Sequence, residues 1–230
     1  MSENVFQRVE QKYILSKKEK DMFLDKIKDW IEKDPYFESN ICNIYFDNND
    51  NDLIVNSLDK PVFKAKVRLR SYDVPNLNSK VFLEIKDKYK GVVGKRRIGL
   101  TLQEFYDYYE KGYVKDEQIM RELDYYFKFF DLKPYMFLAY NRNSYFEKNN
   151  PNLRITIDSN LRSRYDDLRL ELGDRGEKYF EEEEYIMEVK VLNSMPLWLT
   201  KVLSELKIYP ISFSKIGSIY SKDKESECLC

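Results

Sequence analysis

The segment FKAKVRLRSYDV, residues 63–74, alternates cationic and apolar side chains with a period of two residues. In a β-strand, this period places Lys66, Arg68 and Arg70 on one face and the apolar residues between them on the other. For one strand taken alone, a sheet face exposed to solvent is the ordinary explanation. Whether the face lines a charged cavity instead depends on whether other segments repeat the pattern.

Several other segments of β character do repeat it, and they mix acids with the cations. The charged residues that alternate with apolar ones in these segments are Arg8, Glu10, Lys12, Glu84, Lys86, Lys88, Lys95, Arg97, Arg142, Arg154, Asp158, Glu188 and Lys190. Solvated faces usually vary among many polar residue types, whereas lysine and arginine dominate here. The opposite faces are too apolar to meet water, so helices must cover them.

A sheet with helices outside and charge inside closes into a barrel with a polar interior. We therefore predict an α+β fold, a closed antiparallel β-barrel of about eight strands that forms a polar tunnel with helices packed outside. We expect strands over about 5–14, 40–48, 62–72, 79–88, 93–100, 135–146, 152–158 and 184–191, with a short one at 166–172. Without a linker-like segment, the chain is expected to form a single domain over 1–220, followed by a flexible polar tail over 221–230.

Capping boxes predict where two helices begin. Ser16 and Thr101 are each followed three residues later by a glutamate. The apolar stripe of the first helix consists of Met22, Phe23, Ile27, Trp30 and Ile31. We expect two further helices over about 115–132 and 196–206.

The overall charge balance and the absence of histidine exclude several classes of function. The 39 Lys and Arg residues nearly cancel the 40 Asp and Glu residues, so the chain lacks the basic field that drives nonspecific nucleic-acid binding. Without histidine, Ser-His-Asp hydrolysis, Cys-His catalysis and histidine-bound zinc are excluded. Any chemistry must therefore come from Lys, Arg, Glu and Asp.

The cysteines and the hydropathy pattern bear on where the protein is found. Cys42, Cys228 and Cys230 have neither metal-ligand spacing nor the even number of a disulfide framework, which fits a reducing cytoplasm. No stretch approaches the roughly 18 apolar residues of a transmembrane helix, and the N-terminus lacks the apolar region of a signal peptide. We expect a soluble, cytoplasmic protein without direct membrane insertion.

A tunnel lined by cations must hold anions, because about a dozen enclosed positive charges repel one another and lose hydration energy. Phosphate chains such as triphosphates, nucleotides or polyphosphate have the required charge density. Glu10, Glu84 and Glu188 then either pair with neighbouring cations or hold Mg²⁺ or Mn²⁺. We favour Glu188 as the metal ligand and structural pairing for Glu84.

These segments also resemble a known family. The opening strand RVEQKYIL is similar to that of the triphosphate tunnel metalloenzymes, with Arg8 in place of the first acid of their signature. In this respect it resembles the VTC branch, the catalytic domain of the vacuolar transporter chaperone, a polyphosphate polymerase. The segments that resemble this branch in the same order are NIYFDN, SLDKPVFKAKVRLRSY, VFLEIKDKYKGVVGKRR, YNRNSYF, LRITIDSNLRSR, IMEVKV and FSKIGSIY. The resemblance covers about residues 5–220.

The resemblance implies a set of functional residues. Those implied to be catalytic are Lys12, Arg68, Arg70, Arg142, Arg154 and Lys190, and those implied to bind substrate are Arg8, Glu10, Lys66, Glu84, Lys86, Lys88, Lys95, Arg97 and Lys215. Glu188 is implied to bind the Mn²⁺ or Mg²⁺ cofactor.

The resemblance also implies a reaction, the transfer of the ATP γ-phosphoryl group to a growing polyphosphate chain with release of ADP. The implied partners are ATP and polyphosphate or pyrophosphate. Whether a membrane-protein partner threads the product away stays open, and the near-zero net charge argues against nucleic acid as a partner. Two alternatives stay open at this point. In a metal-dependent triphosphatase or polyphosphatase, water replaces the phosphate acceptor, and in a phosphate-binding module the cations bind without turnover.

Overall fold

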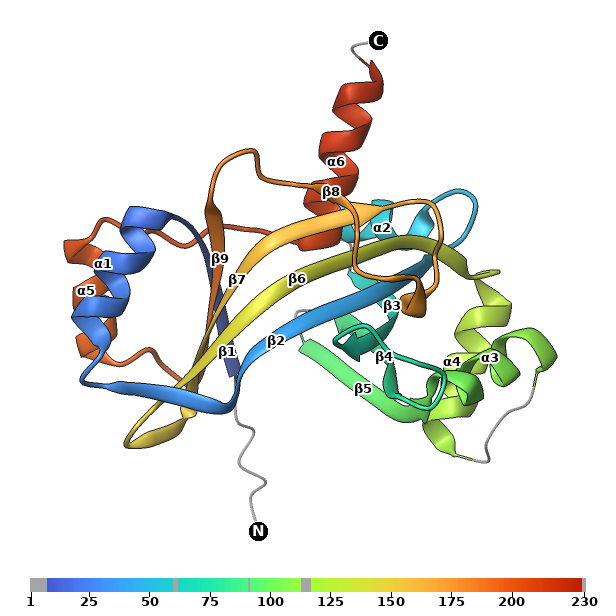
Figure 1. Cartoon of the computed structure of the whole chain (residues 1–230), viewed down its shortest axis with the longest axis horizontal. Coiled ribbons are helices and arrows are strands. Elements are labelled where there is room, and N and C mark those ends of the chain that lie inside the picture. Colours follow the sequence, from blue (N-terminus) through green and yellow to red (C-terminus); the bar gives the residue numbers. More distant parts are fainter. Residues whose placement is uncertain (1–7, 60–61, 91, 113–116, 229–230) are drawn as a thin grey trace. The chain divides into compact units, whose positions relative to one another are not determined.

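A computed structural model describes residues 8–59, 62–90, 92–112 and 117–228. These residues form an α+β structure with one large antiparallel sheet and six α-helices (Figure 1). The strands are β1 (Arg8–Ser16), β2 (Ile31–Asp47), β3 (Phe63–Tyr72), β4 (Lys80–Tyr89), β5 (Val92–Thr101), β6 (Lys133–Glu147), β7 (Asn150–Arg164), β8 (Glu177–Lys178) and β9 (Glu184–Leu192). The helices are α1 (Lys17–Ile27), α2 (Asp52–Leu58), α3 (Leu102–Lys111), α4 (Gln118–Phe129), α5 (Leu197–Glu205) and α6 (Lys215–Cys228), with a short 3-10 helix η1 (Leu170–Leu172).

The hydrogen-bonded order of the sheet is β1-β9-β7-β6-β2-β3-β4-β5, and β8 pairs with β7 outside this path. The pairs with a described register are antiparallel, as predicted. The order begins at β1 and ends at β5, and no hydrogen bonds between these two strands are found among the described residues. The closed barrel that we expect is therefore not confirmed. Besides its pairing with β9, β1 forms an isolated bridge in which the Ile211 amide donates to the Lys12 carbonyl, and this bridge does not join β1 to β5.

The chain forms two compact units. Unit 1 comprises residues 1–39, 140–161 and 180–213, and unit 2 comprises residues 40–139, 162–179 and 214–230. Strands β2, β6 and β7 contribute residues to both. Since three strands are shared in this way, the division does not test the single domain over 1–220, which stays a prediction.

In unit 1, helices α1 and α5 cover the apolar face of β1, β9 and β7. Ile155 and Val189 are completely buried in this core, together with Phe23 from α1 and Leu199 from α5. Figure 1 shows α1 and α5 lying side by side. Because the apolar side chains alternate along the strands, the charged residues between them project from the opposite face.

In unit 2, helices α3 and α4 cover the apolar face of β3 and β4 in the same way. Val67 and Ile85 are completely buried in one cluster with Leu102 and Leu123 from the two helices. Burial of such side chains contributes about 2 kcal/mol each to folding. The predicted sidedness, with apolar faces under helices, is thus confirmed within each unit.

The first helix is shorter than its apolar stripe predicts. It ends at Ile27, Trp30 lies in a turn, and Ile31 begins β2. The ring of Trp30 stacks on that of Trp198, with centroids 5.1 Å apart, and Ile31 is buried in the core of unit 1. These tertiary contacts override the local helical pattern, so the placement of Trp30 and Ile31 on the helix is wrong.

Helix α2 lies where the sequence suggests only a turn. The buried carboxylate of Asp47 accepts hydrogen bonds from the backbone amides of Leu53 and Ile54, both at 2.9 Å, and so satisfies donors at the start of this helix. At the other end of the chain, α6 continues through Cys228, so residues 221–228 of the expected tail are helical. No helix in the described ranges has the length and apolarity that a bilayer crossing requires.

Arg164 organises the segment in which a short strand is expected at 166–172. Its buried guanidinium donates to the backbone carbonyls of Asp167, Arg169 and Arg175 and lies 3.6 Å from the ring centre of Phe137. These bonds hold the backbone in an irregular path that includes η1, so the expected strand does not form there. The strand in this part of the chain is the two-residue β8.

The capping box at α3 gives a test of this fold. The Thr101 hydroxyl accepts from the amide of Glu104, and the Glu104 carboxylate accepts from the amide of Thr101 at 2.8 Å. Thr101→Ala should lower the free energy of unfolding by about 1 kcal/mol in urea denaturation. Gln103→Ala, an exposed substitution in the same helix, serves as the control and should change it little. Equal effects of the two substitutions would contradict this role for Thr101.

Candidate functional site

In unit 2, one face of β3, β4 and β5 is almost entirely cationic, and we call it the cationic face. Its charged residues are Lys64, Lys66, Arg68, Arg70, Lys80, Glu84, Lys86, Lys88, Lys95 and Arg97, placed on one face by the strand registers. Glu84 is the one acid among them. The predicted residues of these three strands are thus brought together, and Lys64 and Lys80 join them.

The registers also set like charges directly opposite one another. Lys66 pairs with Lys86, and Lys86 pairs in turn with Lys95, so three lysines stand in one row across neighbouring strands. Lys64 stands opposite Lys88 in the next row. Like charges that face each other across strands destabilise a sheet. A face of this kind is stabilised when an anion binds to it.

Glu84 holds part of the cationic face in place. Its carboxylate is almost fully buried and contacts Arg68 at 2.6 Å, Lys95 at 3.0 Å and Arg97 at 3.8 Å. Burial raises the pKa of Glu84, but the surrounding cations, Arg68 first, lower it by more, to about 2. Structural pairing, favoured from the sequence for Glu84, matches this geometry.

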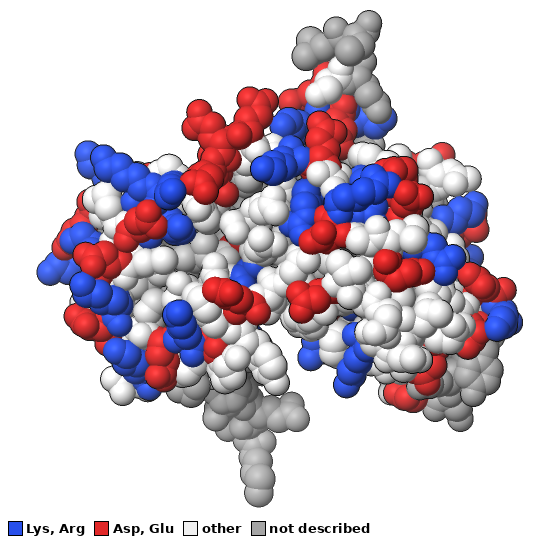
Figure 2. Space-filling model, in the orientation of Figure 1, with Lys and Arg blue, Asp and Glu red and all other residues white. Residues whose placement is uncertain are grey.

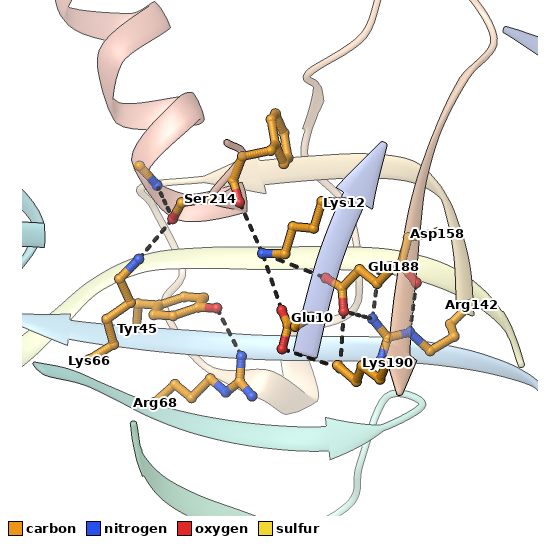
Figure 3. A network of polar contacts seen from close by, with 12 residues as sticks. Glu10, Lys12, Tyr45, Lys66, Arg68, Arg142, Asp158, Glu188, Lys190 and Ser214 are labelled. Atoms are coloured by element: carbon orange, nitrogen blue, oxygen red, sulfur yellow. Dashed lines mark hydrogen bonds and ion pairs between the residues drawn. The ribbon is translucent and has the colours of Figure 1, made fainter. Parts of the chain in front are cut away.

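Two uncharged residues from β2 complete the face. The Tyr45 hydroxyl accepts from Arg68 at 3.1 Å (Figure 3), and the Asn43 side chain accepts from Arg70 at 2.9 Å. Burial raises the pKa of Tyr45, but the charges of Arg68 and Arg70 lower it by more, to about 8. Our sequence analysis missed both residues, although they share parity in the segment NICNIYFDN.

Other predicted residues of unit 2 lie at the edges of this group. Lys66 donates to the Ser214 hydroxyl at 2.8 Å, and the next residue, Lys215, is buried at the start of α6. Lys86 and Lys88 are exposed on β4. Their side chains are therefore open to a ligand from solvent.

In unit 1, acids and cations alternate across β1, β9 and β7, and we call this the ion-pair face. Glu10 pairs with Lys190 and Lys12 pairs with Glu188 in the register of β1 and β9. Lys190 contacts both glutamates, at 4.0 Å for Glu10 and 3.2 Å for Glu188. Figure 3 shows these side chains converging on one another. Four of the predicted residues thus form one network.

Glu188 is the centre of that network. It is buried and contacts Lys190 at 3.2 Å, Arg142 at 3.8 Å and Lys12 at 3.9 Å. Lys12 also donates to the backbone carbonyl of Phe213 at 2.9 Å. Three cations therefore compensate the buried charge of Glu188.

Asp158 anchors Arg142. The alternation in the sequence places Asp158 on the charged face but assigns it no role. Its carboxylate is fully buried and accepts two hydrogen bonds from the Arg142 guanidinium, at 2.6 Å and 2.7 Å. Burial lowers the pKa of Arg142, but electrostatic interactions with Tyr140, Asp158 and Glu188 and the hydrogen bonds to Asp158 raise it well above its ordinary value. Asp158 shares parity with Arg154, so the alternation that selects Arg154 contains the signal for Asp158 as well.

Two of the predicted residues are not placed in the network. Arg154 stands opposite Lys190 in the register of β7 and β9, yet its guanidinium contacts Asp34 at 3.0 Å and its side chain is half exposed. The backbone of Arg8 pairs with Leu192 in β1, and its side chain lies outside the described part of the structure. Basic and acidic side chains are interspersed over the side of the molecule seen in Figure 2.

The donor set bears on whether a metal fits here. Glu188 and Glu10 offer the hard carboxylate oxygens that Mg²⁺ and Mn²⁺ prefer. Among the described residues, however, no group of three or more His, Cys, Asp or Glu side chains is arranged to hold a metal ion. The residues therefore fit a cation that takes most of its ligands from bound phosphate and do not fit a cage built by the protein alone.

Several solved structures share the fold of this chain at low sequence identity. A proposed adenylate cyclase from Bacillus halodurans has a TM-score of 0.57 and 16% identity over 90% of this chain and 93% of its own. A proposed adenylyl cyclase from Hippeastrum, described as having a dominant triphosphatase activity, has a TM-score of 0.54 and 16% identity over 94% and 96%. A proposed adenylate cyclase from Vibrio parahaemolyticus has a TM-score of 0.52 and 11% identity over 93% and 97%.

The family is more specific than the fold. The model of the VTC domain matches residues 7–221, and the chain belongs to that family. This confirms the resemblance found in the sequence. A comparison with the curated proteins finds no similar sequence.

The buried Glu84 carboxylate predicts a specific pH dependence of stability. The pKa of Glu84 in the folded protein lies below its ordinary value of 4.5, so its stabilisation is complete above about pH 4.5 and is lost as the pH falls toward 2. Glu84→Gln should lower the free energy of unfolding by about 3 kcal/mol at pH 7. In urea denaturation, this difference in the free energy of unfolding should shrink below pH 4.5. The exposed control Glu182→Gln should not differ from the wild type in the free energy of unfolding at either pH. A difference that is constant with pH would contradict the assignment.

The contact between Tyr45 and Arg68 predicts a tyrosine that ionises early. In an absorbance titration at the phenolate band, one tyrosine should ionise near pH 8, and Tyr45→Phe should abolish this step. Tyr36→Phe, at an exposed position, should leave it unchanged. If every tyrosine ionises near its usual pKa of about 10, the electrostatic account of the cationic face is wrong.

Proposed function

We propose that this protein binds phosphate chains and transfers the γ-phosphoryl group of ATP to the end of a polyphosphate chain. The observation that carries the proposal is the row of directly opposed lysines, Lys66, Lys86 and Lys95, on a face with a single carboxylate. A polyanion relieves the repulsion within this row, and arginine supplies bidentate contacts to phosphate oxygens. Membership of the VTC family supports the same substrate class.

The proposed chemistry asks for positioning and charge neutralisation. A terminal oxygen of the polyphosphate chain bonds to the γ-phosphorus of ATP, the bond from that phosphorus to the bridging oxygen breaks, and ADP leaves with the electron pair. Because the attacking oxygen is already anionic, no general base is needed, and a chain without histidine is competent. Lysine and arginine side chains neutralise charge on the equatorial oxygens.

The residues of the ion-pair face have distinct parts in this scheme. Asp158 holds the Arg142 guanidinium with two hydrogen bonds, so the cation is oriented before a ligand arrives. Lys190 is partly exposed and exchanges its contact with Glu188 for one with phosphate. Glu188, with Glu10 beside it, would hold Mn²⁺ or Mg²⁺, which supplies Lewis-acid neutralisation of phosphate charge when bound.

Hydrolysis is the second candidate, because one solved structure with this fold is described as having a dominant triphosphatase activity. The same residues bind the donor in both reactions, and they differ in whether water or phosphate attacks. The cytoplasmic location, the membrane-protein partner and the absence of nucleic-acid binding stay predictions from the sequence.

Incubation of the purified protein with ATP and Mn²⁺ separates these functions. Transfer produces long phosphate chains on a gel together with ADP, hydrolysis produces free phosphate, and a binding module produces neither. Lys190→Met keeps the aliphatic stem but removes the charge, and it should lower turnover by about 100-fold. Lys201→Met, at an exposed lysine of α5, is the matched control and should retain activity. Equal activity of both variants would contradict the role given to the ion-pair face.

A further inference from the structure

One buried hydroxyl of the ion-pair face has no partner. Thr156 on β7 is 2% exposed, and its Oγ1 has no hydrogen-bond partner among the residues that the structure describes. Burying a hydroxyl without a hydrogen bond costs folding free energy, and most buried polar side chains avoid it. We therefore asked which acceptor this hydroxyl could bond to when a ligand is bound.

The sheet register places a carboxylate residue directly opposite Thr156. Thr156 stands directly opposite Glu188 in the pairing of β7 and β9. Directly opposed residues project from the same face, with their Cβ atoms about 5 Å apart. The next residue on this face of β7, Asp158, has both carboxylate oxygens bonded to Arg142. Glu188 is therefore the neighbouring acceptor that is able to exchange partners.

The present partners of Glu188 are the cations that a phosphate chain attracts. Lys190 contacts it at 3.2 Å and Lys12 at 3.9 Å. When these lysines turn to phosphate oxygens, the buried carboxylate loses compensation and needs a replacement donor. Thr156 is the adjacent donor, and rotation about a single side-chain bond redirects its hydroxyl.

We propose that Thr156 is a positioning residue that donates a hydrogen bond to Glu188 when a phosphate chain draws lysines away from that carboxylate. This inference rests on the proposed function and identifies a residue through which its site adapts to the ligand. In the ligand-free protein the hydroxyl reduces stability, and in the complex it stabilises the carboxylate. Removal of the hydroxyl should therefore have opposite effects on the two states.

Thr156→Val removes the hydroxyl and nearly keeps the shape of the side chain. Without ligand, the melting temperature of the variant should rise by about 2 °C. Its affinity for tripolyphosphate, measured by calorimetry in metal-free buffer, should fall about tenfold. Thr156→Ser keeps the hydroxyl and should bind as the wild type does. Thr200→Val is the control, because that hydroxyl already donates to the carbonyl of Leu197 at 2.9 Å, and it should leave the affinity unchanged.

A double-mutant cycle tests whether Thr156 acts through Glu188. In a Glu188→Leu background, Thr156→Val should change the tripolyphosphate affinity by less than about twofold. A full tenfold loss in that background would overturn the positioning role, as would wild-type affinity in the single variant. If Thr156→Val does not fold, Thr156→Ala and Thr156→Ser give the same comparison. Failure of the wild type to bind tripolyphosphate overturns the proposed function itself, and this inference with it.

Discussion

The sidedness of the strands is the constraint on which the rest of this structure depends. Along β3, β4, β7 and β9, completely buried apolar residues such as Val67 and Val189 alternate with charged ones. Since helices cover the apolar side, the charged side chains must all project from the opposite side of the sheet. Their mutual repulsion lowers stability, and buried carboxylates such as Glu84 and Glu188 offset part of it. A strongly cationic surface therefore remains compatible with a folded sheet.

The two charged faces differ in composition. The cationic face has a single acid among many cations, which favours capture of a polyanion. The ion-pair face balances Lys12, Arg142 and Lys190 against three carboxylates, so its charges are compensated before a ligand arrives. In the proposed function, Lys190 exchanges its contact with Glu188 for one with phosphate.

The period-two alternation was enough to predict which residues share a face, because the register of paired strands preserves parity. It placed Lys66, Arg68 and Lys95 together without any structure. It did not show which partner each charge has, since partners depend on the exact register and on rotamers. Asp158 and Thr156 share the parity of Arg154, so the alternation places them on the charged face, but their surroundings are known only from the structure. Tyr45 is uncharged, and a search for charged residues does not find it. The early end of α1 and the capping of α2 by the Asp47 carboxylate likewise depend on contacts that the local sequence pattern does not show.

A crystal structure with tripolyphosphate and Mn²⁺ tests the central claim most directly, because the claim concerns where a phosphate chain lies. The account predicts phosphate density within hydrogen-bonding distance of the charged side chains of these faces, such as Arg70 or Arg142. Tripolyphosphate bound at saturating concentration only to other surface residues, with both faces unchanged, would contradict it.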